Sequence, residues 1–387
     1  MSVAALEAKV AHLRAENGRL RRALGDVCGQ IVCGQLTGKL PDNFLEQFNQ
    51  LPDRPFEQVL RFLPARQVLT MRHVSRKFNQ LIRKCSKTMP KIKRDGTVVF
   101  RRNYYGGLIG VWFDNYGEKI TTTQTTAWGG DEVAAISELL RFIRIDSKIF
   151  FSEGLSAADE VLDQLSKAWL TIRPEVVIFS GDLSQTSRDS LRAFLVKVEP
   201  SIRRLHFQEA KNIPDNLLSD ELISAAGRLD RLMVLPTCWG WQPDDNVVSD
   251  INIGDNTLLL MVDADLKRSY CCLTGCSGIT PGGIRAFIEK WMKKQKSEPD
   301  AKSFGFNRSS KSYELTFFKC ANVTPATVEE ACGDLLEKDT IAEAVRSFEG
   351  DAKTIEQVRY TIQCPSSNNR LKILFHYSVR FYCYLFA

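Results

Sequence analysis

Apolar residues recur every seven positions at the N-terminal end of the chain. One series of these positions holds Val3, Val10, Asn17, Leu24 and Ile31, and the other holds Leu6, Leu13, Leu20 and Val27. The two series correspond to heptad positions a and d of a coiled coil. The pattern therefore predicts an amphipathic helix over residues 1–32.

The heptads also carry features for and against pairing with a second copy of the chain. Asn17 at an a position is typical of parallel two-stranded coils, and Glu16 would face Arg21 of a partner helix. Gly18 and Gly25 each cost about 1 kcal/mol relative to Ala in a helix. A single amphipathic helix and a short parallel dimer both remain open. The dimer seam would consist of Leu6, Val10, Leu13, Asn17, Leu20 and Leu24.

Three short helical patterns follow in residues 51–85. The first is expected to begin with Asp53 as its N-cap and to end before Pro64. The second starts at about Ala65, and the third starts after Ser75. A segment of this length is below the ~40 residues that usually build a sufficient core unaided. Part of its apolar surface therefore needs a partner, which is either the rest of the chain or another protein.

Strand-like apolar runs recur at a nearly constant interval farther along the chain. The second residues of these runs, 28, 28, 27 and 27 residues apart, are Ile149, Val177, Leu205, Leu232 and Leu259. Helical patterns lie between several runs, for example over residues 157–170 and 187–198. A fixed period of this length predicts stacked strand–loop–helix units.

The repeats resemble leucine-rich repeats in a degenerate form. The frame of that family places Asn or Cys three residues after the last apolar strand position, where this chain has Ala210 and Thr237. An ordinary α/β sheet with evenly spaced strands therefore stays open as an alternative. In a solenoid, the side chains that alternate with the buried set would form the candidate substrate face, which consists of Phe150, Ile178, His206 and Met233.

The whole pattern places the chain in the α+β or α/β class. It comprises a short N-terminal heptad helix, a three-helix module and an irregular leucine-rich-repeat-like α/β solenoid. A hairpin is expected over residues 97–113, a capped helix over 280–292, and strands at 315–318 and within 371–387. The predicted divisions are 1–32, 51–85, 86–145 as a basic linker and strand region, 146–325 as the repeat region, and 326–387.

Charge is unevenly distributed along the 387 residues. Residues 51–102 hold 14 Lys and Arg against three acidic residues, whereas residues 103–387 have a net charge of −6. The basic run Arg83–Arg102 is one candidate for nucleic-acid binding. It lacks base-stacking aromatic residues until Tyr104 and carries no RNA-binding signature. The composition favours a solvated linker or complementarity to an acidic partner.

Composition also bears on the compartment. No apolar run reaches the ~18 residues of a membrane helix, and the N-terminus lacks the apolar core of a signal peptide. The eleven cysteines include no CxxC pair, so neither disulfides nor a zinc site is expected. We expect a soluble protein of the cytoplasm or nucleus that holds no cofactor.

One segment matches the frame of a catalytic site. Cys364 and Arg370 are spaced as in cysteine phosphatases, in which a thiolate attacks phosphorus and the Arg holds the oxyanions. The segment has Gln363 where a His is expected, no glycine in the loop, and Leu371 where a hydroxyl is expected. A phosphatase-like enzyme is therefore kept as an alternative to a non-catalytic protein.

The segment from Leu51 to Ile82 resembles an F-box over its whole length without a gap. The matching parts are the opening Leu51-Pro52, the middle Val59-Leu60 to Val68-Leu69, and the close Val74-Ser75-Arg76-Lys77. Arg54 and Pro55 stand where an acid and an aliphatic residue are usual, and Phe78 replaces the usual Trp. Residues 146–320 more loosely resemble the F-box-associated C-terminal domains of the expanded nematode F-box families.

This resemblance implies a three-helix hook that docks on a Skp-type adaptor, which in turn recruits a cullin scaffold. The residues carried over to the adaptor contact and the small core behind it are Leu51, Pro52, Val59, Leu60, Leu63, Val68, Leu69 and Val74. The implied function is that of a non-catalytic substrate-recognition adaptor in an SCF ubiquitin ligase, with an unknown protein substrate and optional homodimerisation.

Overall fold

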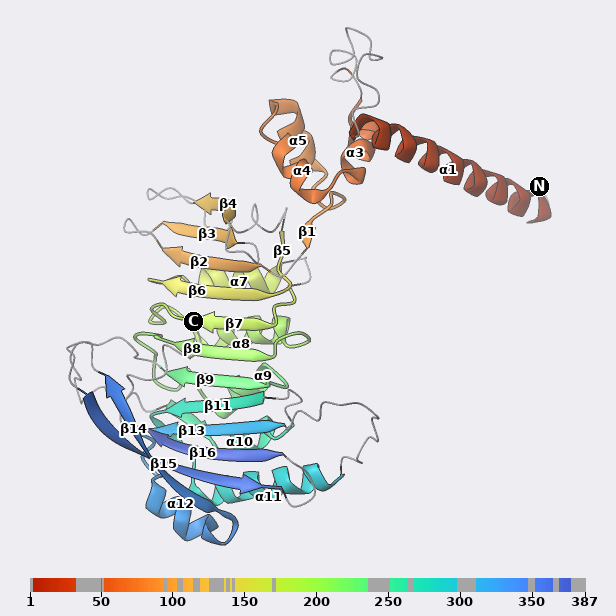
Figure 1. Cartoon of the computed structure of the whole chain (residues 1–387). Coiled ribbons are helices and arrows are strands. Elements are labelled where there is room, and N and C mark those ends of the chain that lie inside the picture. The colour runs from red at the N-terminus through yellow and green to blue at the C-terminus, as the bar shows by residue number, and fades with distance from the viewer. Residues whose placement is uncertain are drawn as a thin grey trace. The chain divides into compact units, whose positions relative to one another are not determined.

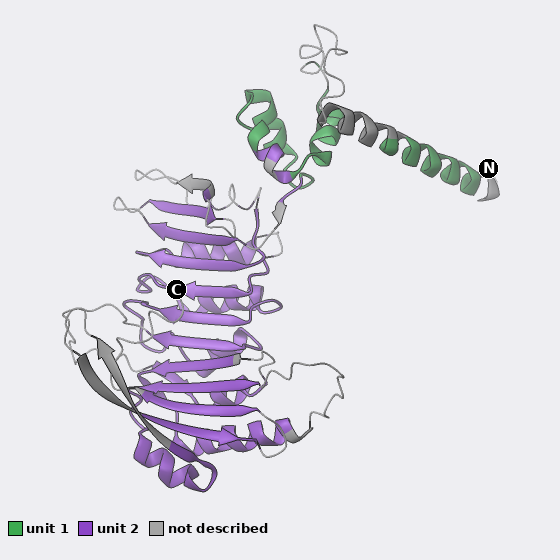
Figure 2. Ribbon diagram, viewed as in Figure 1, with its two compact units in different colours: residues 1–64, 70–89 green, residues 65–69, 90–387 purple. Residues whose placement is uncertain are grey.

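The computed structural model (Figure 1) places most of the chain. It describes residues 3–32, 50, 52–93, 96–102, 107–113, 119–124, 136, 140, 143–168, 172–235, 251–263, 268–297, 311–346, 352–364 and 369–376. These residues fall into two compact units, coloured green and purple in Figure 2. Unit 1 consists of residues 1–64 and 70–89, and unit 2 consists of residues 65–69 and 90–387.

Unit 1 begins with the helix expected from the heptads. Helix α1 covers Val3–Val32, which confirms the predicted helix. Its apolar side chains are open to solvent: Leu6 is 48% exposed, Val10 is 44% exposed and Leu13 is 56% exposed. The helix therefore carries an unburied apolar stripe in the part of the seam whose side chains the structure describes. Leu20 and Leu24 belong to the same seam, but their side chains lie outside the described set.

The described part of the region with the three predicted helical patterns consists of short helices joined by turns. Its helices are α3 (Asp53–Phe62), α4 (Ala65–Met71) and α5 (Arg76–Lys84). Ser75 caps α5 as expected, because its hydroxyl accepts the backbone N–H of Phe78 at 3.2 Å. Asp53 was expected as the N-cap of α3, which is wrong: Pro52 holds that position, and Asp53 is the first helical residue.

In unit 2, twelve strands of the described residues form one sheet. Their spatial order is β14-β15-β16-β13-β11-β9-β8-β7-β6-β2-β3-β4. The bounds are β2 Thr97–Arg102, β3 Leu108–Phe113, β4 Lys119–Gln124, β6 Lys148–Glu153, β7 Val176–Phe179, β8 Arg204–Gln208, β9 Arg231–Leu235, β11 Arg268–Thr274, β13 Ser312–Phe318, β14 Glu337–Arg346, β15 Ala352–Gln363 and β16 Arg370–His376.

Smaller elements complete unit 2. Two parallel pairs lie outside the large sheet, β1 (Ile92–Lys93) with β5 (Ile143–Arg144) and β10 (Ile251–Gly254) with β12 (Cys276–Gly278). The helices are α7 Asp159–Lys167, α8 Arg188–Val198, α9 Asp220–Ala225, α10 Asp255–Met261, α11 Pro281–Ser297, α12 Pro325–Cys332 and the 3₁₀ helix η1 Gly333–Leu335. The predicted hairpin is confirmed, because β2 and β3 pair antiparallel.

The sequence period corresponds to one strand step in the sheet. Ile149 lies beside Val177, Val177 beside Leu205, and Leu205 beside Leu232, all in parallel strands. The fifth predicted strand position is wrong, since Leu259 lies in helix α10. Leu258 and Met261 are its buried apolar residues, at helical spacing. The next strand is β11, whose Cys271 lies beside Leu232.

The helices of these units lie on one face of the sheet. In Figure 1, α7, α8, α9 and α10 are drawn behind the strands from β6 to β13. The parallel strands β6, β7, β8, β9, β11 and β13 follow one another in sequence order without reversal. A doubly wound sheet reverses its strand order and places helices on both faces. The parallel region of unit 2 is therefore a single-direction stack of βα units.

A row of phenylalanines forms the core between sheet and helices. Phe100, Phe151, Phe179 and Phe207 occupy neighbouring strands, and their rings stack with centroids 5.4, 4.9 and 5.0 Å apart. Phe194 of α8 meets Phe151 and Phe179 edge-on. All five side chains are fully buried. The ladder identifies the side of the sheet that faces the helices.

Hydrogen bonds from acidic side chains join consecutive units at the helix starts. Asp159 accepts the N–H of Ser187 at 2.6 Å, Asp220 accepts the N–H of Gly254 at 2.7 Å, and Asp255 accepts the N–H of Thr280 at 2.8 Å. Each aspartate is the first residue of one helix, and each donor stands at the start of the next helix. The carboxylates satisfy N–H groups that a helix start leaves without intrahelical acceptors.

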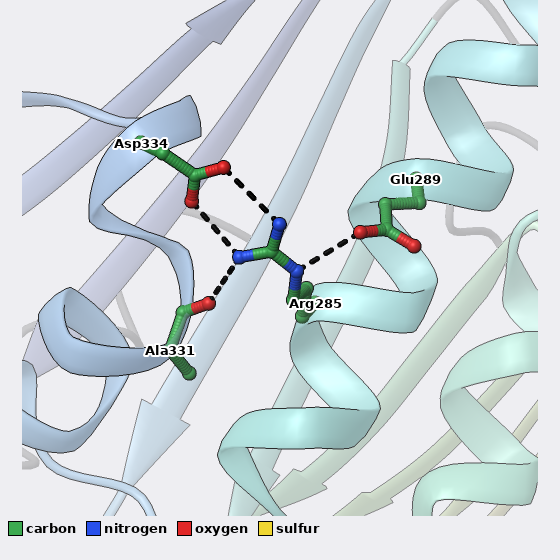
Figure 3. A network of polar contacts seen from close by, with 4 residues as sticks. All are labelled: Arg285, Glu289, Ala331 and Asp334. Atoms are coloured by element: carbon green, nitrogen blue, oxygen red, sulfur yellow. Dashed lines mark hydrogen bonds and ion pairs between the residues drawn. The ribbon is translucent and has the colours of Figure 1, made fainter.

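A polar network fixes α12 and η1 to α11 at the far end of the sheet (Figure 3). Arg285 of α11 donates to both carboxylate oxygens of Asp334, at 2.9 and 3.1 Å, and to the carbonyl of Ala331 at 2.6 Å. Its Nε donates to Glu289 at 2.9 Å. The hydrogen bonds from Arg285 lower the pKa of Asp334 below its usual value.

Replacing a ladder ring should test how much unit 2 depends on this core. Phe179→Ala removes a fully buried ring that contacts three others. We expect it to lower the free energy of unfolding of unit 2 by about 3–5 kcal/mol, as for other large-to-small core changes. Denaturant unfolding followed by circular dichroism measures this. Val196→Ala, at a position 57% exposed on α8, is the control; a loss below ~1 kcal/mol at Phe179 would contradict the assigned core.

Candidate protein-binding surfaces

Unit 1 presents apolar side chains at the ends of its helices. Phe62, the last residue of α3, is 53% exposed, and Val74, directly before the cap of α5, is 62% exposed. Pro52 at the start of α3 is also exposed. Single apolar side chains in solvent are common. These three are candidates for a contact with another protein.

The eight residues predicted for the adaptor contact and the core behind it differ in how deeply their side chains are buried. Leu60 and Val68 are each 1% exposed and belong to the core. Val59, Leu63 and Leu69 are half-buried, whereas Pro52 and Val74 are exposed. Leu51 lies outside the described residues. The residues that can reach a partner are therefore those at Pro52, Val74 and the half-buried positions, and Phe62 joins them.

Phe62 was missed from the sequence because it falls outside the helical series of Phe56, Val59, Leu60 and Leu63. That series marks the buried face of α3, and an apolar residue next to it was not assigned a role. An aromatic residue off the buried stripe, directly before the Leu-Pro that ends the helix, is the signal that could have identified it.

Contacts between α3 and α5 hold this surface in place. The rings of Phe56 and Phe78 meet edge-on with centroids 5.2 Å apart, so Phe78 fills its position without the usual Trp. Lys84 forms an ion pair with Asp53 at 3.0 Å. Thr88 donates a hydrogen bond of 2.6 Å to Glu57, which lowers the pKa of that carboxyl.

Pro55 fits the first turn of α3. It is the third residue of a helix that begins at Asp53, and the N–H groups of a first turn have no intrahelical acceptor. The proline therefore removes no hydrogen bond from the helix. The departure from the usual F-box pattern at this position leaves the helix intact.

The candidate substrate face lies on the side of the sheet opposite the helices. Phe150, Ile178, His206 and Met233 are neighbours in register on strands β6 to β9. Phe150 and Ile178 are half-buried. His206 is only 9% exposed and Met233 only 2%, so neither side chain is accessible as the substrate face requires. Met233 packs in a buried cluster with Leu235, Tyr270 and Cys272.

The phosphatase-like frame is divided between two strands. Cys364 follows β15 directly, and Arg370 begins β16, which pairs antiparallel with β15. The Cys364 side chain is 2% exposed, whereas Arg370 is exposed. Residues 365–368, the loop that would hold a phosphate, lie outside the described residues. The geometry places a buried thiol at this position rather than an accessible nucleophile.

Several described cations of the basic run Arg83–Arg102 contact neighbouring groups. Lys84 pairs with Asp53, and Lys91 donates to the carbonyl of Leu140 at 3.3 Å. Burial lowers the pKa of Lys91 to about 8. Arg102 donates to the carbonyl of Leu155 at 3.0 Å. Three of its cations therefore hold local structure.

The described residues contain neither a metal-binding cluster nor a membrane-spanning helix. Within them, no group of three or more His, Cys, Asp or Glu side chains is placed to hold a metal ion. No described helix combines the length and apolarity needed to cross a membrane. Every cysteine whose side chain is described is free of a disulfide.

Comparison with known proteins gives one match. No curated protein and no solved structure matches the chain. Residues 48–89 match the F-box domain family, and the matched span includes α3, α4, α5 and the exposed Phe62 and Val74. The chain therefore contains an F-box domain at residues 48–89.

Proposed function

We propose that this F-box protein is the substrate-recognition subunit of an SCF-type cullin-RING ubiquitin ligase. F-box domains bind Skp-type adaptors, and the observation that carries the proposal is the match at residues 48–89. The exposed apolar residues Pro52, Phe62 and Val74 supply a contact surface on this domain. In this role the domain holds the adaptor, and a cullin scaffold joins through it.

Unit 2 recruits the protein substrate in this proposal. Its leucine-rich-repeat-like stack of βα units covers one sheet face with helices and leaves part of the other face for binding. Repeat proteins use such extended faces for recognition. The chain itself is non-catalytic in this role, since ubiquitin transfer belongs to other subunits, and the complex acts in the cytoplasm or nucleus.

The adaptor interface is tested with a single exposed residue. Val74→Asp places a charge in the contact while leaving the buried residues Leu60 and Val68 unchanged. We expect co-precipitation with a Skp-type adaptor to fall by on the order of tenfold, because burying an unpaired carboxylate opposes binding. Quantitative pull-down of the purified full chain measures the change.

Val196→Asp is the matched control for this experiment. The residue type and substitution are the same, and the exposures are similar, at 62% for Val74 and 57% for Val196. Val196 lies on α8 of unit 2, so the control should bind the adaptor as the unmodified chain does. Equal binding by both variants and the unmodified chain would place the adaptor contact elsewhere.

We also propose that α1 pairs in parallel with α1 of a second copy. Its stripe of Leu6, Val10 and Leu13 is exposed in the single chain. A parallel pair would bury that stripe and bring Asn17 of each copy together at an a position. Glu16 of one helix would then face Arg21 of the other.

Removing seam residues and strengthening the helix should shift the pairing in opposite directions. The double change Leu6→Ala with Leu13→Ala should raise the dissociation constant of the dimer by on the order of tenfold or more, because burial of these leucines stabilises the dimer. Gly18→Ala should favour it, since a Cβ at Gly18 meets no atom within 4 Å and Ala gains about 1 kcal/mol in a helix. Sedimentation equilibrium of the full chain reports both; a purely monomeric unmodified chain would refute the pairing.

A further inference from the structure

The open face is the side of strands β2 and β6–β9 that lies opposite the helices. Phe151 and Phe179 point toward α8, where their rings meet Phe194. Successive side chains of a strand point to opposite faces. Phe150 and Ile178 therefore belong to the open face, together with Lys148 and Arg204 at the same alternation. Figure 1 shows this face of the strands toward the viewer.

Two rows of different chemistry cross this face. In the apolar row, Val99, Phe150 and Ile178 lie side by side in register and are each half-buried. Two residues along each strand, about 7 Å away, a second row holds Lys148, Val176, Arg204 and Arg231 in register. The face thus pairs an apolar edge with a cationic edge.

The charges of three neighbouring cations act on the side chain of His206. It lies in register beside Ile178, two residues from Arg204 on β8. Burial and the nearby charges of Arg231, Arg204 and Lys148 lower its pKa to about 4. Within the described chain, its Nε2 is buried without a hydrogen-bond partner. Burial, together with these neighbouring positive charges, keeps the histidine neutral at physiological pH.

The positive charge of the row exceeds the negative charge beside it. Among the described neighbours, Glu175 approaches Arg204 at 3.3 Å and is 53% exposed. Glu175 is thus a carboxylate of the described residues that forms an ion pair with this row, and it stands beside the two cations Lys148 and Arg204. Lys148 and Arg204 are two strands apart, about 10 Å. Charges spread over that length fit several carboxylates along a segment better than a single phosphate group.

We propose that the open face binds an acidic segment of another protein, with apolar side chains along one edge and carboxylates along the other. This inference rests on the proposed function, in which unit 2 recruits the substrate. The apolar edge of the segment packs on Val99, Phe150 and Ile178. Its carboxylates lie over Lys148 and Arg204. The accessible apolar row ends at β8, since Met233 and Cys272 are buried on this side.

Synthetic peptides test the predicted chemistry on the full chain. The probe is a fluorescein-labelled peptide that alternates leucine and aspartate, and its binding is followed by anisotropy. We expect it to bind more tightly than peptides that alternate leucine with lysine or serine with aspartate. Raising the salt concentration should weaken it, because exposed charges are screened. Equal binding of the leucine–aspartate and leucine–lysine peptides would overturn the proposal.

A charge exchange locates the binding on this face. Lys148→Glu with Arg204→Glu should weaken the leucine–aspartate peptide at least tenfold and should strengthen the leucine–lysine peptide. If that variant fails to fold by circular dichroism, Lys148→Gln with Arg204→Gln decides, with the same loss expected for the acidic peptide. The matched control is Arg192→Glu with Lys293→Glu, two exposed cations on α8 and α11, which should bind as the unmodified chain does.

The binding experiment also distinguishes two other ligands of the open face, a phosphopeptide and a nucleic acid. Tighter binding of a leucine–phosphoserine peptide, lost in the Lys148/Arg204 variants, would overturn the carboxylate proposal in favour of phosphate. Binding of a single-stranded oligonucleotide at the same residues would overturn it in favour of nucleic acid. Adaptor pull-down from the same preparations distinguishes failure of the open-face proposal from failure of the proposed function. If the chain binds the adaptor but not the peptide, only the open-face proposal is refuted. If the chain does not bind the adaptor, the proposed function is refuted.

Discussion

Unit 2 depends on the registered stacking of one βα unit on the next. A single unit of one short strand and one helix cannot bury both of its apolar surfaces. Parallel strands about 4.8 Å apart bring equivalent side chains into contact. In this chain that contact is a ladder of phenylalanine rings about 5 Å apart, from Phe100 through Phe151 and Phe179 to Phe207. Phe194 closes the ladder from the helix side.

The arrangement of the opposite face follows from that ladder. Once one set of alternate residues faces the helices, the other set must point the other way, and the same register aligns it into rows. Phe150 lies beside Ile178 for the same reason that Phe151 lies beside Phe179. Side chains of one kind, such as the cations Lys148 and Arg204, can therefore lie in one row although their strands are far apart in sequence. A repeat of 27 or 28 residues thus becomes a continuous surface.

The F-box domain is built on a different principle. Its few helices provide a small core around Phe56, Leu60 and Phe78, and contacts such as that between Lys84 and Asp53 join α3 to α5. So small a unit cannot cover all of its apolar residues, and Phe62 and Val74 remain in solvent. The exposed residues that make the domain suitable for a partner are a consequence of its size.

Local patterns in the sequence determined several helices, the cap of α5 and the strand period as far as Leu232. Heptads predicted α1, Ser75 predicted the start of α5, and the interval from Ile149 to Leu232 predicted neighbouring strands. Only the tertiary structure decided which element an ambiguous apolar run forms and which side chains on the sheet are buried. The run Leu258–Met261 fits a strand and a helix equally well, and packing selected the helix. Likewise, Met233 holds its predicted place in the sheet but is buried in a cluster that includes Tyr270 and Cys272. Alternation along a strand shows which way a side chain points, whereas its burial depends on residues distant in sequence.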